Sequence, residues 1–195
     1  MQPLRFAVIG AGFWSNYQVA AWKELHGVEL VALCDTNKES VHTLAHKFGV
    51  ANAYTTAEEL LAKENVDFVD IITDVDSHAS LSRLAAAKGV NVICQKPMAG
   101  SLADAEKMAD SCKMQNVKLF VHENFRWQAP IRALKKAIDG GEIGRIFKAR
   151  VTFCSAFPVF ENQPFLSDLS HFILTDIGSH VLDICRFLFG EVKRL

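Results

Sequence analysis

The sequence of 195 residues predicts an α/β fold, in which a doubly wound parallel sheet is followed by the start of a smaller α+β domain. Two observations lead to this prediction. Short, continuous apolar runs, typical of strands buried on both faces, alternate with segments of helical length. Capping residues and glycines also mark where the helices begin and end. Strands separated by helices in this order form right-handed βαβ crossovers, which build a mostly parallel sheet.

The alternation extends over the first 122 residues. The expected strands are Leu4–Ile9, Val28–Cys34, Phe68–Ile72, Asn91–Cys94 and Val117–Val121. The expected helices are Phe13–Leu25, a helix from the capping box at Thr36 to Phe48, a short helix after Thr56, Ser77–Lys88, and Ser101–Met114. Gly49 and Gly89 follow two of these helices and are expected to end them.

The pattern changes after residue 122, so we predict one domain over 1–122 and a partial second domain over 123–195. The second domain is expected to contain the helix Pro130–Asp139, an alternating strand Ile146–Cys154, and a last helix Ser179–Phe189. One strand is not a sheet, and its unpaired edges would favour aggregation. We therefore expect the 195 residues to belong to a longer polypeptide, or other chains to cover this domain.

The composition excludes several classes of protein. The chain has 21 basic and 22 acidic residues, hence a formal net charge of −1, so no long-range field favours nucleic acid or an anionic membrane. No apolar run approaches the roughly 18 residues needed to span a bilayer, and the N-terminus lacks the features of a signal peptide. The five cysteines form no CxxC pair, which favours buried reduced thiols. We expect a cytoplasmic protein with neither nucleic acid nor membrane as a partner.

A glycine motif lies where the first strand turns into the first helix. It reads Gly10-Ala11-Gly12-Phe13-Trp14-Ser15. Gly10 permits a tight turn, and Gly12 lets the backbone approach a pyrophosphate at the helix N-terminus. Ser15 replaces the third glycine of the GxGxxG pattern but is still small. Alone, the motif could be only a tight turn.

Asp35 strengthens the nucleotide interpretation. It ends the second strand, 25 residues after Gly10, where a carboxylate would accept hydrogen bonds from an adenosine ribose. The alternative is a capping or turn residue. Because a carboxylate here repels a 2′-phosphate, we predict that NAD binds in preference to NADP.

Two further segments follow buried strands, at the sheet edge where open parallel sheets bind ligands. The first contains Thr73 and ends at His78, which could instead be a solvated neighbour of a helix cap. The second is Gln95-Lys96-Pro97. Lys96, held by the following proline, could meet a substrate hydroxyl, or be an ordinary surface lysine.

The last helix carries a candidate acid–base pair. On an α-helical wheel Asp176, His180, Asp183 and Phe187 fall within about 60° of one another. An apolar stripe lies roughly 130° away and comprises Val181, Ile184, Cys185 and Leu188. An aspartate one turn before a histidine can fix its tautomer and raise its basicity.

Two alternatives remain for this segment. Asp176 could be a helix cap beside a solvated His180, or the two could join Asp183 and His171 in a metal site. No cysteine or glutamate completes such a site at a familiar spacing, so we predict none.

Together these motifs resemble the Gfo/Idh/MocA oxidoreductases, named after glucose–fructose oxidoreductase, inositol dehydrogenase and a rhizopine-catabolism protein. The residues that carry the resemblance are Gly10-Ala11-Gly12, Asp35, Thr73 with His78, Gln95-Lys96-Pro97, and Asp176-x-Gly178-x-His180-x-x-Asp183. The family implies a Rossmann domain followed by an α/β substrate domain, whose open antiparallel sheet forms the subunit interface of a homo-oligomer. It also implies hydride transfer between a nicotinamide and a carbon of a sugar, polyol or related cyclic alcohol.

Carried over by position, Lys96 would contact the reacting hydroxyl, His180 would be the acid/base, and Asp176 its partner. The predicted cofactor site comprises Gly10, Gly12, Phe13, Trp14, Asp35, Thr73, His78, Gln95 and Lys96.

Three features depart from the family pattern: Gln95 replaces the usual glutamate before the lysine, Asp74 replaces a frequent proline, and the sequence stops where family members continue. The alternative function is therefore an NAD(H)-binding module without turnover. A methyltransferase binding S-adenosylmethionine is disfavoured by Lys96 and by the Asp176 and His180 pair.

Overall fold

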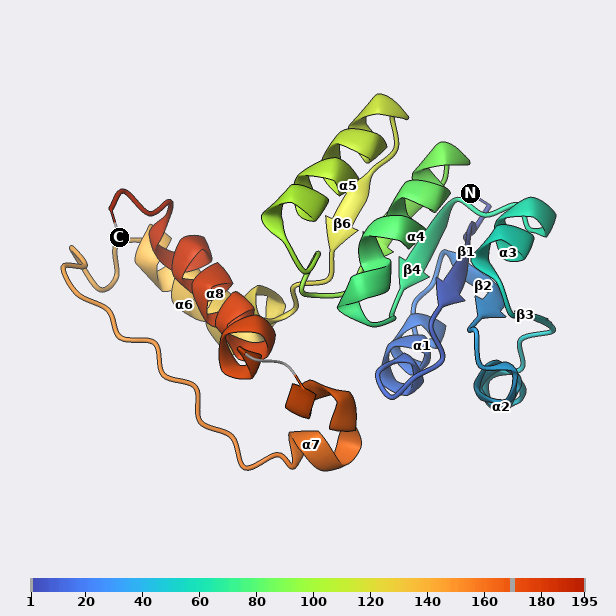
Figure 1. Ribbon diagram of the computed structural model, residues 1–195. Helices are drawn as coiled ribbons and strands as arrows, with labels where there is room; N and C mark the ends of the chain where they lie inside the picture. The colour runs from blue at the N-terminus through green and yellow to red at the C-terminus, as the bar shows by residue number, and fades with distance from the viewer. Residues whose placement is uncertain (1, 169–170, 195) are drawn as a thin grey trace. The chain divides into compact units, whose positions relative to one another are not determined.

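The computed structural model describes residues 2–168 and 171–194 (Figure 1). These residues divide into two compact units, with the boundary between His122 and Glu123. The division falls where the alternation of strands and helices ends.

The first unit contains a six-stranded, fully parallel sheet in the order β3-β2-β1-β4-β5-β6. The strands are β1 (Leu4–Ile9), β2 (Val28–Cys34), β3 (Asn52–Tyr54), β4 (Phe68–Ile71), β5 (Asn91–Cys94) and β6 (Leu119–Val121). This is the strand order of a dinucleotide-binding Rossmann sheet, so the predicted α/β fold is confirmed. The order reverses between β1 and β4, and such a reversal opens a crevice at the carboxyl ends of the strands.

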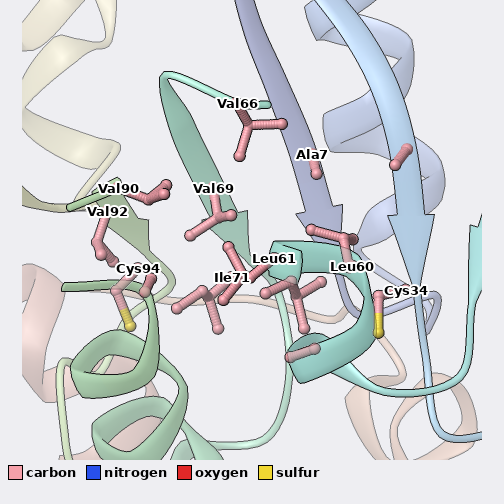
Figure 2. Close-up of a cluster of buried hydrophobic side chains, with 14 of the residues drawn as sticks. Ala7, Cys34, Leu60, Leu61, Val66, Val69, Ile71, Val90, Val92 and Cys94 are labelled. Atoms are coloured by element: carbon pink, nitrogen blue, oxygen red, sulfur yellow. The ribbon is translucent and has the colours of Figure 1, made fainter. Parts of the chain in front are cut away.

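Five helices cover both faces of this sheet (Figure 1). They are α1 (Ser15–Lys23), α2 (Lys38–Phe48), α3 (Ala57–Lys63), α4 (Val75–Ala87) and α5 (Leu102–Met114). Alternate side chains of β1 point to opposite faces. Ala7 and Ile9 pack in a core with α3, α4 and α5 (Figure 2), whereas Phe6 and Val8 pack in a second core with α1 and α2. Both faces are therefore buried, which explains why the strands read as continuous apolar runs.

Helix α2 ends where the sequence predicted, but its N-terminal cap is a different residue from the one expected. The capping box was expected to start at Thr36, but the side chain that accepts the Ser40 N–H is that of Asn37, at 3.0 Å. The N–H of Asn37 itself donates to Asp35 at 2.7 Å. Asn37 is therefore the N-cap, one residue after Thr36, and α2 begins at Lys38. Gly49 ends α2 in the left-handed conformation, with φ of 67°, as predicted.

The second unit is helical in the residues that the structure describes. Its elements are η1 (Phe125–Trp127), α6 (Ala129–Asp139), α7 (Val159–Asn162), η2 (Pro164–Asp168), the π-helical η3 (Ile173–Gly178) and α8 (Ser179–Phe189). The predicted strand Ile146–Cys154 is wrong, because this segment has no regular structure. The physical reason is the absence, among the described residues of the unit, of a neighbouring strand to accept and donate its backbone hydrogen bonds.

All five cysteines are free thiols, as expected, but only three of them are buried. Cys34, Cys94 and Cys112 are free and buried, whereas Cys154 is free and exposed. Burial raises the pKa of both Cys34 and Cys94 to about 12. Separately, no helix in the described ranges is long and apolar enough to cross a membrane.

Candidate active site

The glycine turn between β1 and α1 is shaped by its first and last residues. Gly10 has φ of +113°, and a Cβ there would lie 2.2 Å from the carbonyl oxygen of Ile72, so only glycine fits. The buried Ser15 hydroxyl donates to the Gly10 carbonyl at 2.7 Å and closes the turn. A Cβ on Gly12 would meet nothing within 4 Å in the described chain. The turn therefore leaves open the approach to its backbone that a pyrophosphate requires.

Asp35 directly follows β2, and its side chain lies against this turn. One carboxylate oxygen accepts the Ala11 N–H at 2.6 Å, and the other accepts the Asn37 N–H at 2.7 Å. Each oxygen of a carboxylate has a second lone pair. Because the side chain is only partly buried, it is positioned to accept hydroxyl hydrogen bonds as well.

An aromatic group stands beside the turn. The rings of Phe13, Trp14 and Tyr17 pack on one another with centroids between 5.2 and 5.7 Å apart. Trp14 and Tyr17 remain exposed. Tyr17 was not among the predicted residues, although it lies on α1 one turn from Phe13. The rings are tilted to one another by 58–79°, so the group offers aromatic edges and faces against which an apolar part of a ligand can pack.

His78 joins two loops at the carboxyl edge of the sheet. Its ring is buried, and its nitrogens face the carbonyl oxygens of Thr73 at 3.2 Å and Pro97 at 2.9 Å. Asp74, not His78, caps α4 by accepting the Ser77 N–H at 3.1 Å. The alternative of a solvated His78 is therefore wrong, since the ring holds the loop after β4 against the loop after β5.

Gln95 and Lys96 lie in that second loop and lead to a buried acid that the sequence analysis did not single out. Gln95 contacts Gln18, and Gln18 contacts Asp70 in the middle of β4. Burial raises the pKa of Asp70, whereas hydrogen bonds from Trp22 and Gln18 and the nearby His122 act in the opposite direction. The sequence signal for this residue was a single aspartate within the otherwise apolar strand Phe68–Ile71, which indicates a buried acidic side chain.

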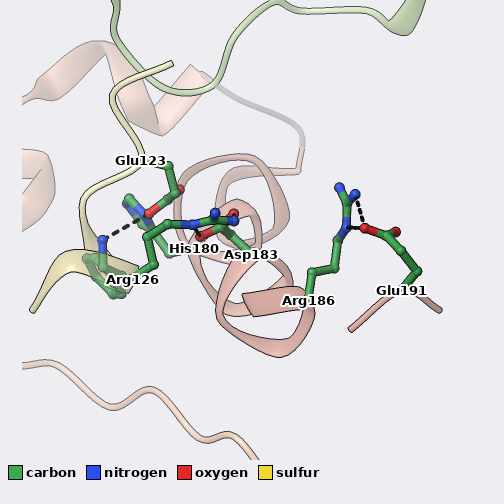
Figure 3. Close-up of polar contacts among 7 residues, drawn as sticks. Glu123, Arg126, His180, Asp183, Arg186 and Glu191 are labelled. Carbon is green, nitrogen blue, oxygen red and sulfur yellow. Dashed lines mark hydrogen bonds and ion pairs between the residues drawn. The ribbon is translucent and has the colours of Figure 1, made fainter. Parts of the chain in front are cut away.

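In the second unit, His180 is held between a carboxylate and an aromatic ring. Its Nδ1 lies 2.5 Å from Glu123 Oε1 (Figure 3). Its ring stacks on Phe125, with centroids 3.9 Å apart and planes 4° apart. Next to this pair, Arg126 forms a two-point ion pair with Asp183, in which Nε lies 2.7 Å from Oδ2. The contact with Asp183 raises the pKa of Arg126. His180 thus has its ring plane and one nitrogen fixed.

The α-helical wheel misplaced His180. The buried residues of α8 are His180, Ile184 and Leu188, so His180 lies on the buried stripe and not opposite it. Asp176 belongs to the π-helical segment before α8, whose wider turn does not follow 100° per residue. The carboxylate placed at Nδ1 of His180 comes from Glu123, 57 residues earlier in the chain. The role of Asp176 stays a prediction.

The structure brings the predicted residues together in two groups. The first unit gathers Gly10, Gly12 and Asp35 at one turn, and Thr73, His78, Gln95 and Lys96 in the adjoining loops. The second unit holds His180. No group of three or more histidine, cysteine, aspartate or glutamate residues is placed to hold a metal ion within 2–168 and 171–194.

Known proteins resemble this chain over nearly its whole length. It is 49% identical to the D-apiose dehydrogenase of Paraburkholderia graminis over 97% of the chain and 50% of that protein. It is 29% identical to the myo-inositol 2-dehydrogenase of Thermotoga maritima over 96% of the chain and 55% of that protein. The chain thus spans about half the length of the curated relatives it matches.

A solved structure agrees with the fold. An oxidoreductase from Agrobacterium radiobacter, in complex with NAD+, L-tartaric acid and magnesium, superposes with a TM-score of 0.96 at 43% identity, covering all of this chain and 59% of that one. Residues 4–123 match the oxidoreductase family with an NAD-binding Rossmann fold, and residues 131–195 match the GFO/IDH/MocA C-terminal domain. With both parts of the sequence matched in order, the chain belongs to the Gfo/Idh/MocA family of oxidoreductases.

Proposed function

We propose that this chain forms the cofactor-binding part and the acid–base part of an NAD-dependent dehydrogenase of a sugar or polyol. The observation that carries the proposal is the turn at Gly10 and Gly12, which leaves its backbone accessible beside the Asp35 carboxylate. A diphosphate and a ribose with two free hydroxyls fit these groups. A 2′-phosphate would bring its charge against Asp35, so NAD is the proposed cofactor and NADP the poorer one.

The remaining cofactor contacts are proposed for residues that flank the turn. Phe13 and Trp14 would pack against the cofactor, and Thr73, Gln95 and Lys96 would line its path along the carboxyl edge. His78 would act indirectly, because its ring nitrogens already face the carbonyl oxygens of Thr73 and Pro97.

The acid–base chemistry is proposed for His180. Oxidation of an alcohol removes a hydride from carbon and a proton from oxygen, and bound NAD would take the hydride. A carboxylate only accepts hydrogen bonds, so Glu123 holds the proton on Nδ1 of His180 and leaves Nε2 as the basic nitrogen. Lys96 would donate to the substrate oxygen and stabilise its developing charge. Asp176 is kept as a second acidic residue of this site.

The proposed substrate class is a small polyhydroxylated sugar or polyol. It rests on the relatives, which include a D-apiose dehydrogenase, a myo-inositol 2-dehydrogenase and a levoglucosan dehydrogenase. We also propose a cytoplasmic location, which buried free thiols favour. A homo-oligomer formed through the second unit is proposed because Phe147, Ile173 and Leu174 are largely exposed there.

The experiment is a titration with NAD+ and NADP+, followed by turnover with a panel of sugars and polyols. Trp14 lies at the glycine turn, so its fluorescence reports binding directly. We expect NAD+ to bind more tightly than NADP+, and at least one polyol to reduce it to NADH. Binding without reduction of NAD+ by any substrate would support the second candidate, an NAD(H)-binding module without turnover. Tighter NADP+ binding would contradict both.

A further inference from the structure

A buried carboxylate lies beneath the loop that carries Lys96, and neither cofactor binding nor acid–base chemistry uses it. Asp70, in β4, has no exposed surface. The side-chain amide of Gln18 donates to both of its oxygens, at 2.9 and 2.7 Å. The indole N–H of Trp22 donates to one of them at 2.7 Å. A buried carboxyl group needs these hydrogen bonds, because leaving any polar group unmatched at such a site is costly.

The contacts continue from Gln18 to the backbone of Lys96. Gln95 Nε2 donates to Gln18 Oε1 at 3.0 Å, and the Lys96 N–H donates to Gln95 Oε1 at 2.8 Å. Two side-chain amides therefore connect the buried carboxylate to the loop. We call Asp70, Gln18 and Gln95 the amide relay.

Two groups that can only donate, the Lys96 N–H and the Trp22 indole N–H, set the direction of every hydrogen bond in the amide relay. A backbone N–H only donates, so Lys96 requires the oxygen of Gln95 and turns the amide nitrogen of Gln95 toward Gln18. Gln18 must then present its oxygen to Gln95 and its nitrogen to Asp70. The Trp22 indole also only donates. Asp70 is thus required as a pure acceptor.

We propose that Asp70 is a positioning residue for Lys96. Asp70 accepts hydrogen bonds from the amide nitrogen of Gln18, so the amide oxygen of Gln18 faces residue 95 and requires a donor there, which glutamine supplies. The inference rests on the proposed role of Lys96 in the dehydrogenase. It accounts for the departure noted in the sequence, in which Gln95 stands where the family pattern has glutamate.

The amide relay predicts that two single substitutions each disrupt its hydrogen bonds, whereas the double substitution restores them. Gln95→Glu places a carboxylate against the oxygen of Gln18; if Gln18 rotates to donate to it, its oxygen meets Asp70. Asp70→Asn alone places two N–H groups together if Gln18 does not rotate. In the double variant all bonds can form with the direction reversed. The new amide at position 70 accepts from Trp22 and donates to Gln18, and Gln18 donates to the new carboxylate at position 95.

The experiment is a double-mutant cycle on the full chain, read by amide hydrogen exchange of Lys96 and by denaturant unfolding. Leaving a buried polar group unmatched typically costs about 1–3 kcal/mol, so each single variant should speed exchange of the Lys96 N–H and lower the folding equilibrium constant by about tenfold or more. The double variant should recover to within about threefold of wild type. The matched controls are Asp110→Asn and Gln115→Glu, which change exposed residues of the neighbouring helix region and should have additive, near-zero effects.

A further readout separates positioning from mere stability. Asp70→Asn should lower kcat while the Kd for NAD+ stays within about twofold, and the double variant should restore kcat.

The outcomes are distinct. Additive effects of the two substitutions would overturn the amide relay even if the dehydrogenase is active. Coupling between them, without turnover of any polyol, would support the relay and count against the proposed function. If Asp70→Asn does not fold alone, a folded double variant supports the relay and an unfolded one contradicts it.

Discussion

The carboxylate of Asp35 is the residue that selects the cofactor in our proposal, and its contacts make the selection testable. It is held by the N–H groups of Ala11 and Asn37 while remaining partly exposed. Asp35→Ser should weaken NAD+ binding and strengthen NADP+ binding. The Kd for NADP+ divided by the Kd for NAD+ should therefore fall by about tenfold, which is the contribution of one charge-assisted hydrogen bond. The measurement is a tryptophan fluorescence titration of the wild type and of Asp35→Ser with each cofactor. An unchanged ratio would show that Asp35 is a structural cap only.

His180 and Glu123 form the pair on which the acid–base proposal depends. His180→Ala should lower kcat by ~10²–10⁴, the usual contribution of a positioned general base. Glu123→Gln should lower it less, because an amide can still hydrogen-bond Nδ1 but does not stabilise the protonated ring. In neither variant should NAD+ affinity change much. Near-normal turnover of His180→Ala would show that the pair is structural.

The cysteines differ in exposure enough to be told apart chemically. Thiol reagents attack the thiolate, and burial raises the pKa of Cys34 and Cys94 to about 12. At about pH 8 the exposed Cys154 should react quickly with a thiol reagent, while Cys34 and Cys94 react only after unfolding. Quantifying modified thiols with and without denaturant measures this. Rapid modification of Cys34 or Cys94 in the native protein would contradict the buried environment.

At the scale of elements, the local signals of the sequence predicted the first unit except for the short strand β3 (Asn52–Tyr54), and they predicted the second unit less well. β2 and β5 begin and end where their apolar runs do, since strands buried on both faces leave a continuous pattern. The strand expected at Ile146–Cys154 failed because a strand needs a partner, which no local pattern reveals. The contact of Glu123 with His180 joins residues far apart in sequence, and the burial of His180 contradicts the helical wheel, which placed it away from the apolar stripe.

The N-terminus of α2 shows how small such an error can be, and it gives a direct test. Asn37 accepts the Ser40 N–H, whereas Thr36 is the residue that the capping box favoured. Asn37→Ala should destabilise the chain by about 1 kcal/mol, the typical value of a side-chain cap. Thr36→Ala should cost far less and is the matched control. Denaturant unfolding compares the two, and equal losses, or a larger loss for Thr36→Ala, would contradict the observed cap.

For the whole molecule, the two units differ in how completely they bury their apolar side chains. The first has two cores, one on each face of its sheet. The second leaves Phe147 89% exposed in a segment without regular structure, together with exposed Phe153 and Phe157. Each large apolar side chain left in water forgoes about 1.5–3 kcal/mol. The second unit is therefore the part of the molecule whose order depends most on further contacts.

Amide hydrogen exchange of the full chain at several protein concentrations tests this dependence. Amides of β1 and β4, in the middle of the sheet, should exchange slowest and independently of concentration, because they open only with global unfolding. Amides of residues 145–157 should exchange rapidly at low concentration. If second copies of the chain cover the exposed phenylalanines, as the proposed homo-oligomer requires, their protection should rise with concentration by mass action. Protection of residues 145–157 that equals that of the sheet at the lowest concentration would contradict the weaker order of this unit. Protection that stays low at every concentration would instead exclude copies of the same chain as its cover.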